Sequence, residues 1–240
     1  MAVDEGKLVR NVVRLVKPPE YTPSEREVWS RTEVRKFLRT AATDRLHAAW
    51  RLSLYGLRRG EVLGLRWSDI NLKAGTLTVR QARVLVDYRV RIEEPKSRNG
   101  KRTLPMDDAL VAALTDLRKR QAKESEAAGT AYLADLADLA WYADGDEYVV
   151  TDELRIPVHP EWYSDEFGRL LKWAKLRKIR LHDSRHTTLS LMEKAGVPIS
   201  IVSKWAGHYD SAFTMKTYVH ASDDDLMEGT KTLAKIHKIA

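Results

Sequence analysis

The sequence contains no cysteine, and this absence removes several kinds of chemistry at once. Without a thiol the chain can form no disulfide, no thiolate metal site and no cysteine nucleophile. It also lacks an apolar run of the roughly 18 residues that a transmembrane helix needs. Residues 1–16 have no continuous apolar centre of the kind found in a signal peptide. We therefore expect a protein of the cytoplasm, or of the nucleoid if it binds DNA, with no membrane partner.

Positive charge exceeds negative charge in this chain. Its 240 residues include 41 Lys and Arg against 34 Asp and Glu, which gives a formal net charge of +7. A basic balance of this size suits a polyanion, although many basic proteins bind no nucleic acid. Hydrophobic residues make up 43% of the chain, which is enough for the core of one large domain or two small ones.

Apolar residues recur at helical spacing in several stretches. Ser30 or Thr32 can cap the first helix after residue 26, and Asp107 or Asp108 can cap another. Ser164 can cap a helix that leads into the last quarter of the chain. The predicted helices cover residues 30–38, two patterns within 46–72 that join at 56–60, 107–128 and 166–177.

Between residues 75 and 106 the hydrophobic period changes from helical to alternating. The alternation predicts three antiparallel strands, at residues 76–79, 84–92 and 102–105. The connection between the last two strands contains Asn99-Gly100, a strong signal for a tight turn. This connection is basic and of a kind that is usually solvated, since it carries Lys96, Arg98, Lys101 and Arg102. The sequence thus predicts an α+β, mainly α-helical chain with a small three-stranded antiparallel sheet.

Residues 181–220 gather the side chains that phosphodiester chemistry needs. His182 and Arg185 are three residues apart at the start of an apolar-periodic run, so they share one face of a helix. A guanidinium on that face matches two phosphate oxygens, whereas the simpler interpretation is a solvated helix end. His182 and His186 also have the spacing of a zinc pair. Against zinc, Asp183 stands where HExxH has Glu, and no obvious third ligand follows.

A second helix follows this one. Residues 195–198 read as a helix stop and a turn, and residues 198–206 can form the next helix. Gly207 then breaks that helix and places the imidazole of His208 at its end, and Tyr218 follows ten residues later. Taken singly, such a histidine is usually a capping or packed residue and such a tyrosine is usually a half-buried aromatic. Their order along the chain is more informative.

The order of HDSRHT, an AGV turn, Gly-His and TYVH resembles the C-terminal signature of the tyrosine recombinases, the phage integrase family. The chain departs from that pattern at several positions. Ser184 stands in place of Leu, Trp205-Ala206 in place of Arg or Leu followed by Leu, and Tyr209 in place of Ser. Upstream, Tyr55 replaces the usual Thr of a Thr-Gly-Leu-Arg segment. These departures leave the chemical groups in place and change their packing.

The resemblance covers about residues 27–240 and assigns roles to individual residues. Arg58 falls on the first catalytic arginine of the family and Glu61 on the acidic residue behind it. The Pro-Lys-Ser segment at Lys96 is similar to the hairpin segment that carries the catalytic lysine, with Lys101 as the alternative. The implied catalytic set is Arg58, Lys96, His182, Arg185, His208 and Tyr218, with no metal and no cofactor.

By the same resemblance, residues 27–240 form a catalytic domain with a C-terminal tail helix. Residues 1–26 are then a linker and the last helix of an otherwise missing core-DNA-binding domain, so the chain is a catalytic domain by itself or a short family member. The implied activity is site-specific DNA recombination through a 3'-phosphotyrosyl intermediate, without metal or ATP. The implied partners are double-stranded DNA, further copies in a homotetramer on two duplexes, and DNA-bending accessory proteins, in the cytoplasm or nucleoid of a bacterial host.

Two other functions share this residue pattern. A type IB topoisomerase uses the same groups to nick and rejoin one strand without exchanging partners, but the short hairpin and the HDSRHT segment favour a recombinase. A non-catalytic DNA-binding protein could retain the same fold. The presence of Tyr218 together with all five supporting residues argues against that alternative.

Overall fold

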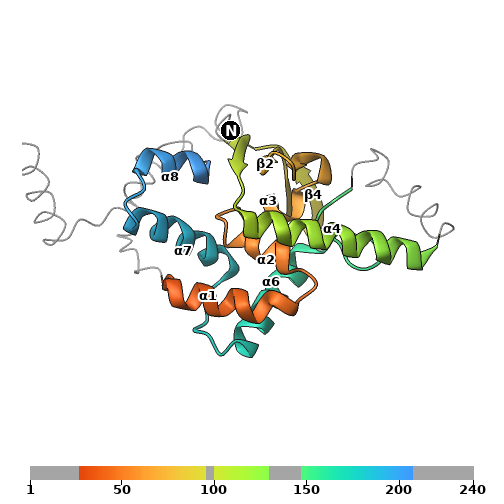
Figure 1. Ribbon diagram of the computed structural model, residues 1–240, viewed down its shortest axis with the longest axis horizontal. Coiled ribbons are helices and arrows are strands. Elements are labelled where there is room, and N and C mark those ends of the chain that lie inside the picture. The colour runs from red at the N-terminus through yellow and green to blue at the C-terminus, as the bar shows by residue number, and fades with distance from the viewer. Residues whose placement is uncertain (1–26, 96–99, 130–146, 208–240) are drawn as a thin grey trace, which may run out of the picture.

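The computed structural model describes residues 27–95, 100–129 and 147–207. They form mainly helices, with a three-stranded antiparallel sheet and a separate two-stranded ribbon (Figure 1). The helices and 3-10 turns are α1 (Arg31–Thr40), η2 (Ala41–Thr43), α2 (His47–Ser53), α3 (Arg59–Gly64), η3 (Trp67–Asp69), α4 (Asp108–Ala128), α6 (Pro160–Trp173), α7 (Leu181–Lys194) and α8 (Ile199–Ala206). The strands are β1 (Ile70–Asn71), β2 (Thr76–Val79), β3 (Ala82–Val86), β4 (Arg89–Glu93) and β5 (Arg102–Pro105). The predicted fold class, mainly helical with a three-stranded sheet, is confirmed.

A cluster of aromatic side chains holds α1, α2 and α6 together. The ring of Phe37 in α1 lies 5.3 Å from that of Trp29 and 5.3 Å from that of Phe167 in α6. Trp50 of α2 stacks on Tyr163 of α6 with ring centroids 4.3 Å apart. All five side chains are buried, and large rings in such contact supply much of a core's packing energy. The loop that follows α2, which carries Gly56, therefore begins at a tightly packed helix.

Local capping signals predicted several helix ends correctly. Ser30 caps α1: its hydroxyl accepts from the backbone N–H of Glu33 at 3.3 Å, and the Glu33 carboxylate accepts from the backbone N–H of Ser30 at 2.8 Å. Asp107 caps α4 by accepting from the backbone N–H of Leu110 at 2.7 Å. At the other end of the chain, α8 ends at Gly207 in the left-handed conformation, with φ 63°.

The helix predicted for residues 166–177 begins and ends earlier than expected. It is α6, and its cap is His159, whose side chain accepts from the backbone N–H of Glu161 at 3.3 Å. Ser164 lies inside the helix, where its hydroxyl donates to the carbonyl of Pro160 at 3.1 Å. The prediction of Ser164 as the cap was wrong because Pro160 at the first helical position, with its fixed φ, already marks the start.

The strand pairing also differs from the prediction. β2 pairs with both β1 and β5, whereas β3 and β4 pair only with each other in the described part of the sheet. The predicted strand 84–92 is thus two strands joined by a turn at Asp87 and Tyr88, which have φ 49° and 59°. Such a turn normally reads Asn-Gly or Asp-Gly, and here tyrosine follows Asp87 in place of glycine, so the turn signal is weak. As a result, β5 returns to β2 and brings Arg102 into the interior.

No helix in the described part of the chain is suited to crossing a lipid bilayer. The last helix and the linker predicted for residues 1–26, and the tail helix predicted after Tyr218, lie outside the described residues. The same holds for residues 96–99 and 130–146.

Candidate active site

A buried carboxylate lies at the centre of the candidate site. Glu61 of α3 is 5% exposed, and its two oxygens accept from the guanidinium of Arg102 at 3.0 and 2.9 Å. The guanidinium of Arg58 donates to the same carboxylate at 2.7 Å. A guanidinium nitrogen of Arg185 lies 3.9 Å from it. Three arginines, from the start of α3, from β5 and from α7, therefore surround one glutamate.

The pairing of Arg58 with Glu61 has a local cause. Arg58 is the N-cap residue of α3, and Glu61 is the third residue of that helix. The carboxylate accepts from the backbone N–H of Arg58 at 2.8 Å, which satisfies one donor at the helix start. The same spacing recurs at α7, where the Asp183 carboxylate accepts from the backbone N–H of Arg180 at 3.0 Å. An Arg-x-x-acid motif thus caps the start of a helix twice in this chain, at α3 and at α7. This capping role does not depend on a role in catalysis.

Arg185 is held in one orientation by backbone carbonyls. Its guanidinium donates to the carbonyl of Gly56, in the loop after α2, and to the carbonyl of Ala206, at the end of α8. The side chain is only 2% exposed. A buried guanidinium is tolerated only when it is paired and hydrogen-bonded, and here Glu61 and two carbonyls meet that requirement.

The end of α8 is held by all three arginines. The carbonyls of residues 205, 206 and 207 accept from Arg102, Arg185 and Arg58, at 2.7, 2.5 and 3.5 Å respectively. The last carbonyls of a helix lack partners within the helix and carry partial negative charge, so cations stabilise them. In the sequence, His208 follows this turn directly.

The cluster keeps a net positive charge. Burial alone would raise the pKa of Glu61, but hydrogen bonds from Arg102 and the charges of Arg102, Arg185 and Arg58 lower that pKa from 4.5 to about 2. The glutamate is therefore ionised at neutral pH, and three guanidiniums around one carboxylate leave a charge of +2. An anion such as a phosphodiester is the natural ligand for this arrangement.

His182 lies on α7 with Arg185, as its spacing predicts, but its side chain is exposed. Its ring meets that of His186 edge to face, with centroids 4.8 Å apart. Within the three described stretches, no three His, Asp or Glu side chains are arranged to hold a metal ion. His182 instead lines a pocket between α6 and α7 of about 700 Å³.

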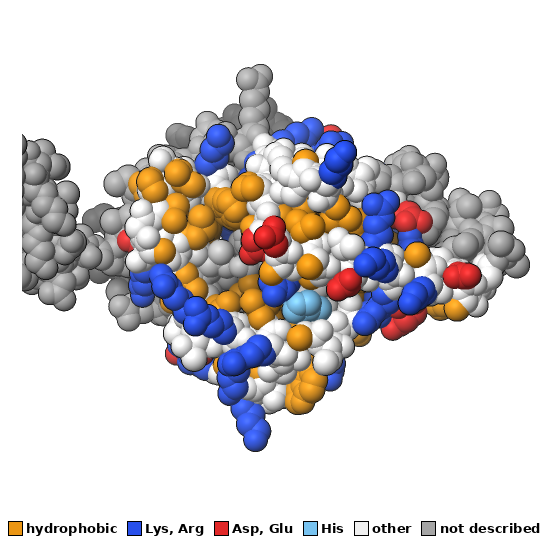
Figure 2. Space-filling view, in the orientation of Figure 1, with side chains coloured by type: hydrophobic (Ala, Val, Ile, Leu, Met, Phe, Trp, Pro, Cys, Tyr) orange, Lys and Arg blue, Asp and Glu red, His pale blue; other side chains and the backbone are white. Residues whose placement is uncertain are grey.

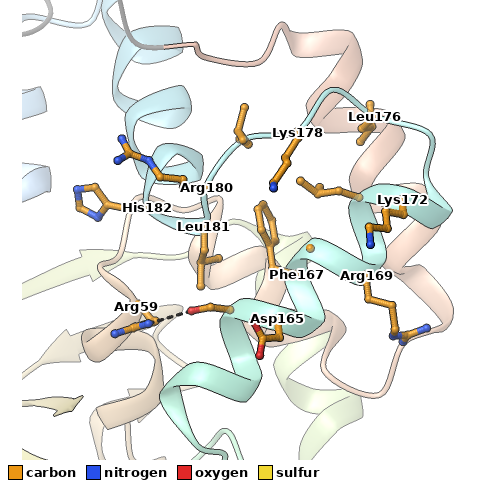
Figure 3. A pocket seen from close by; sticks show the side chains of 14 residues that line it. Arg59, Asp165, Phe167, Arg169, Lys172, Leu176, Lys178, Arg180, Leu181 and His182 are labelled. Carbon is orange, nitrogen blue, oxygen red and sulfur yellow. Dashed lines mark hydrogen bonds between the residues drawn. The ribbon is translucent and has the colours of Figure 1, made fainter. Parts of the chain in front are cut away.

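Among the charged side chains that line this pocket, the basic ones outnumber the acidic (Figure 3). Lys178 extends into it from the segment between α6 and α7. On its other side Arg59 donates to the hydroxyl of Ser164 at 2.9 Å. The charged residues around it are Arg59, Asp165, Arg169, Lys172, Lys178, Arg180 and His182. Elsewhere the two signs are mixed: Figure 2 shows lysines, arginines and carboxylates interspersed on the face over which α4 runs.

Three of the departures from the recombinase pattern have a packing explanation. Trp205 donates its indole N–H to the carbonyl of Tyr55 at 2.8 Å, and the two rings lie 5.3 Å apart. The hydroxyl of Ser184, which is buried, donates to the carbonyl of Leu181 at 2.6 Å and lies 3.3 Å from that of Ser53. The unusual tryptophan and tyrosine thus compensate for each other where α8 meets the end of α2.

The structure brings together only part of the predicted set. Arg58 and Arg185 meet at Glu61, and His182 stands on the same helix as Arg185. The other predicted residues lie outside the described residues: Lys96, His208 and Tyr218. The alternative lysine, Lys101, is exposed and pairs with Glu94 at 3.2 Å.

Arg102 was predicted to be solvated, and this prediction was wrong because the side chain is buried against Glu61. A signal for it existed in the strand alternation. In β5, residues 102 and 104 point to the buried face and residues 103 and 105 to the exposed one. Arg102 therefore shares the inward face with Leu104, as the two-residue period of a strand requires.

Known proteins that are similar to this chain are integrases and recombinases. The model of the phage integrase family matches residues 29–225. A "Tyrosine recombinase XerC-like" protein of Caldanaerobacter subterraneus subsp. tengcongensis is 30% identical, over 97% of this chain and 61% of the relative. An "Integrase" of Saccharopolyspora erythraea is 25% identical, over 92% of this chain and 60% of the relative. The chain thus spans about 60% of the length of these two relatives.

A solved structure shares the fold. The Tn1549 transposon integrase in complex with transposon right end DNA superposes with a TM-score of 0.72 at 21% identity, over 94% of this chain and 70% of that one. At 21% identity this likeness shows a shared fold and nothing further. The family match over most of the chain and the relative at 30% identity go further. The chain belongs to the phage integrase family.

Proposed function

We propose that this chain carries the catalytic domain of a site-specific DNA recombinase, which cleaves and rejoins strands through a 3'-phosphotyrosyl intermediate to integrate or excise mobile or phage DNA. The observation that carries the proposal is the positively charged cluster of Arg58, Arg102 and Arg185 around Glu61. Family membership supports it, as do relatives named integrase and recombinase. Residues 27–240 are the proposed catalytic domain with its tail helix, and residues 1–26 the linker and last helix of a core-DNA-binding domain.

Arg58 and Arg185 are the proposed clamp for the scissile phosphate. When a phenol attacks a phosphodiester, negative charge gathers on the non-bridging oxygens, and guanidinium groups fixed beforehand stabilise that charge. The Arg58 side chain is 40% exposed, so a phosphate can reach it, and Glu61 holds it in place. His208 would add a hydrogen bond to the same oxygens.

The remaining groups move protons. Tyr218 is the proposed nucleophile, and a phenol of ordinary pKa near 10 needs a base at neutral pH, which His182 supplies. The phenolate oxygen bonds to phosphorus while the bond from phosphorus to the deoxyribose 5' oxygen breaks. Lys96 gives its proton to that leaving oxygen. The products are a 3'-phosphotyrosyl bond and a free 5' hydroxyl.

The proposed reaction needs neither ATP nor metal. The phosphotyrosyl bond keeps the energy of the cleaved phosphodiester, so a 5' hydroxyl from a second duplex can reverse the step. The arginines take the electrostatic role that a metal ion has in other phosphoryl transfers. The proposed partners are double-stranded DNA, a homotetramer on two duplexes and DNA-bending accessory proteins, in the cytoplasm of a bacterial host, where its DNA lies.

Covalent trapping tests the nucleophile. The chain is incubated in EDTA with a randomised pool of nicked suicide duplexes, and DNA-linked peptides are mapped by mass spectrometry. An adduct at Tyr218 that Tyr218→Phe abolishes, with DNA binding retained, is the expected result. Tyr88→Phe is the matched control, because that phenol is 96% exposed and its loss should leave the yield unchanged. An adduct at another tyrosine contradicts the assignment, and no adduct at any tyrosine favours a non-catalytic DNA-binding protein.

Two further comparisons sharpen the test. Arg58→Lys should lower the rate of adduct formation by about 100- to 1000-fold, whereas Arg59→Lys, next to it but bonded to Ser164, should leave that rate nearly unchanged. Transfer of the trapped strand to the 5' hydroxyl of a second duplex separates a recombinase from a topoisomerase, which rejoins only the original strand.

A further inference from the structure

Arg102 bonds to both parts of the arginine cluster, the Glu61 carboxylate and the end of α8. Its side chain is 5% exposed, compared with 2% for Arg185 and 40% for Arg58. A guanidinium has five N–H groups, and those of Arg102 make four contacts within the protein. Two go side by side to Glu61, one goes to the carbonyl of Trp205 at 2.7 Å and one to the carbonyl of Gly100 at 3.2 Å. Four of its five N–H groups are thus used within the protein.

We infer that Arg102 is a positioning residue of the proposed active site: by binding Glu61 and the last turn of α8 at once, it fixes the guanidiniums of Arg58 and Arg185 where the phosphate needs them. The inference rests on the proposed function. Glu61 contacts both clamp arginines, and the turn that Arg102 binds also accepts from both of them.

The geometry gives the reason that arginine is needed at this position. A planar fork binds two carboxylate oxygens in parallel while its third edge, at Nε, binds a carbonyl in a different direction. Lysine has a single ammonium group in place of this planar fork. It cannot make two parallel bonds to Glu61 and also bond to the carbonyl of Trp205. If Arg102 is lost, Glu61 loses two of its bonds. Its remaining partners, Arg58 and Arg185, can then re-pair around it.

A purely structural role makes a different prediction, and the chain offers a matched control. Arg45 also binds a glutamate by two parallel bonds, to Glu124 at 2.9 and 2.6 Å, and also donates to two carbonyls, those of Thr151 and Asp152. Its side chain is 15% exposed. Arg45→Met therefore removes the same kinds of bond as Arg102→Met, namely two to a glutamate and two to backbone carbonyls. The partners of Arg45 do not belong to the arginine cluster.

The first measurement needs no cleavage. Side-chain Nε–Hε resonances of ¹⁵N-labelled arginines are compared in the wild-type chain, Arg102→Met and Arg45→Met, with the signals of Arg58 and Arg185 assigned by substitution. In Arg102→Met these two signals should shift or broaden, and in Arg45→Met they should stay in place while both variants lose a similar amount of thermal stability. Unmoved signals in a folded Arg102→Met overturn the inference.

The second measurement is the single-turnover rate of adduct formation on a duplex captured by the wild-type chain. A misplacement of about 1 Å costs about a hundredfold in rate, so Arg102→Met should fall by about that factor while its DNA dissociation constant stays within about threefold. Equal rates for the Arg102→Met and Arg45→Met variants overturn the inference.

A third variant covers the case in which Arg102→Met does not fold. Arg102→Lys keeps the positive charge beside Glu61 but not the fork, so it should fold, move the same two resonances and cleave at least about tenfold more slowly. Wild-type rates and resonances in Arg102→Lys overturn the inference. A wild-type chain that forms no adduct contradicts the proposed function instead, and the resonances then decide the positioning role by themselves.

Discussion

Replacing Glu61 with glutamine removes the charge at the centre of the arginine cluster and keeps the size of the side chain. The pKa of Glu61 is about 2 in the folded chain against an ordinary 4.5, because Arg102, Arg185 and Arg58 outweigh the effect of burial. A carboxyl whose pKa is lowered on folding stabilises the fold above its unfolded pKa and loses that contribution as the pH falls through its folded pKa. The window for Glu61 is therefore pH 4.5 down to about 2.

The size of the effect follows from the same two values. The difference between 4.5 and about 2 is about 2.5 pH units, which corresponds to on the order of 3 kcal/mol at neutral pH. In Glu61→Gln three guanidiniums also face one another without a carboxylate, so the variant should be less stable than the wild type by more than this amount. Only the part due to ionisation of Glu61 depends on pH.

Urea unfolding at several pH values between 7 and 3 measures the effect. The quantity of interest is the difference in free energy of unfolding between the wild type and Glu61→Gln, because other carboxyls with lowered pKa, such as those of Asp183 and Glu33, are present in both chains and cancel. This difference should be largest at pH 7 and should shrink below about pH 4.5.

A control separates the buried carboxylate from surface charge. Asp116→Asn removes a carboxylate that is 79% exposed, and it should change the free energy of unfolding little at any pH in the series. A difference between wild type and Glu61→Gln that stays constant from pH 5 to pH 3 would refute the reasoning, because the three arginines would then not be holding the glutamate in its charged form.

Four further substitutions test the packing of the fold by urea unfolding at neutral pH. Gly64→Ala should destabilise by about 1–3 kcal/mol, because its Cβ would lie 3.0 Å from the backbone of β3, whereas Gly168→Ala meets nothing within 4 Å and should stabilise α6 by about 0.5–1 kcal/mol. Trp205→Phe keeps the contact with the ring of Tyr55 but loses the indole hydrogen bond, and should cost about 1 kcal/mol. Gln121→Met leaves three buried polar groups without their partner and should cost about 3 kcal/mol or more. Equal stabilities for the two alanine variants, or a Gln121 variant as stable as wild type, would contradict these packing arguments.

Helix ends were predictable because their causes lie within a few residues. Ser30 and Asp107 cap helices by bonding to N–H groups three residues on, and Gly207 ends α8 in a conformation that glycine adopts freely. The strand pairing was not predictable in this way. The turn at Asp87 and Tyr88 uses no glycine, and the pairing of β2 with β5 is fixed by contacts between segments far apart in sequence.

The residue types of the candidate site and their order could be predicted from the sequence. The hydrogen bonds and ion pairs among these residues could not. The sequence placed Arg58 and Arg185 in one site, and in the structure both meet Glu61. Arg102 was missed because its charge and its place in a basic connection outweighed the strand alternation that turns it inward. The partner of a buried arginine depends on which carboxylate the fold brings to it, and that choice is made by tertiary structure. The roles of Lys96, His182, His208 and Tyr218 stay predictions.

The three cluster arginines occupy positions 58, 102 and 185, so the cluster forms only after most of the chain has been synthesised and folded. A nascent chain whose α7 is still in the ribosome, or a fragment clipped within residues 130–146, lacks at least one of the arginines and one of the elements that hold them. For the proposed recombinase, an incomplete chain therefore lacks the full set of guanidiniums around Glu61 that would hold the scissile phosphate.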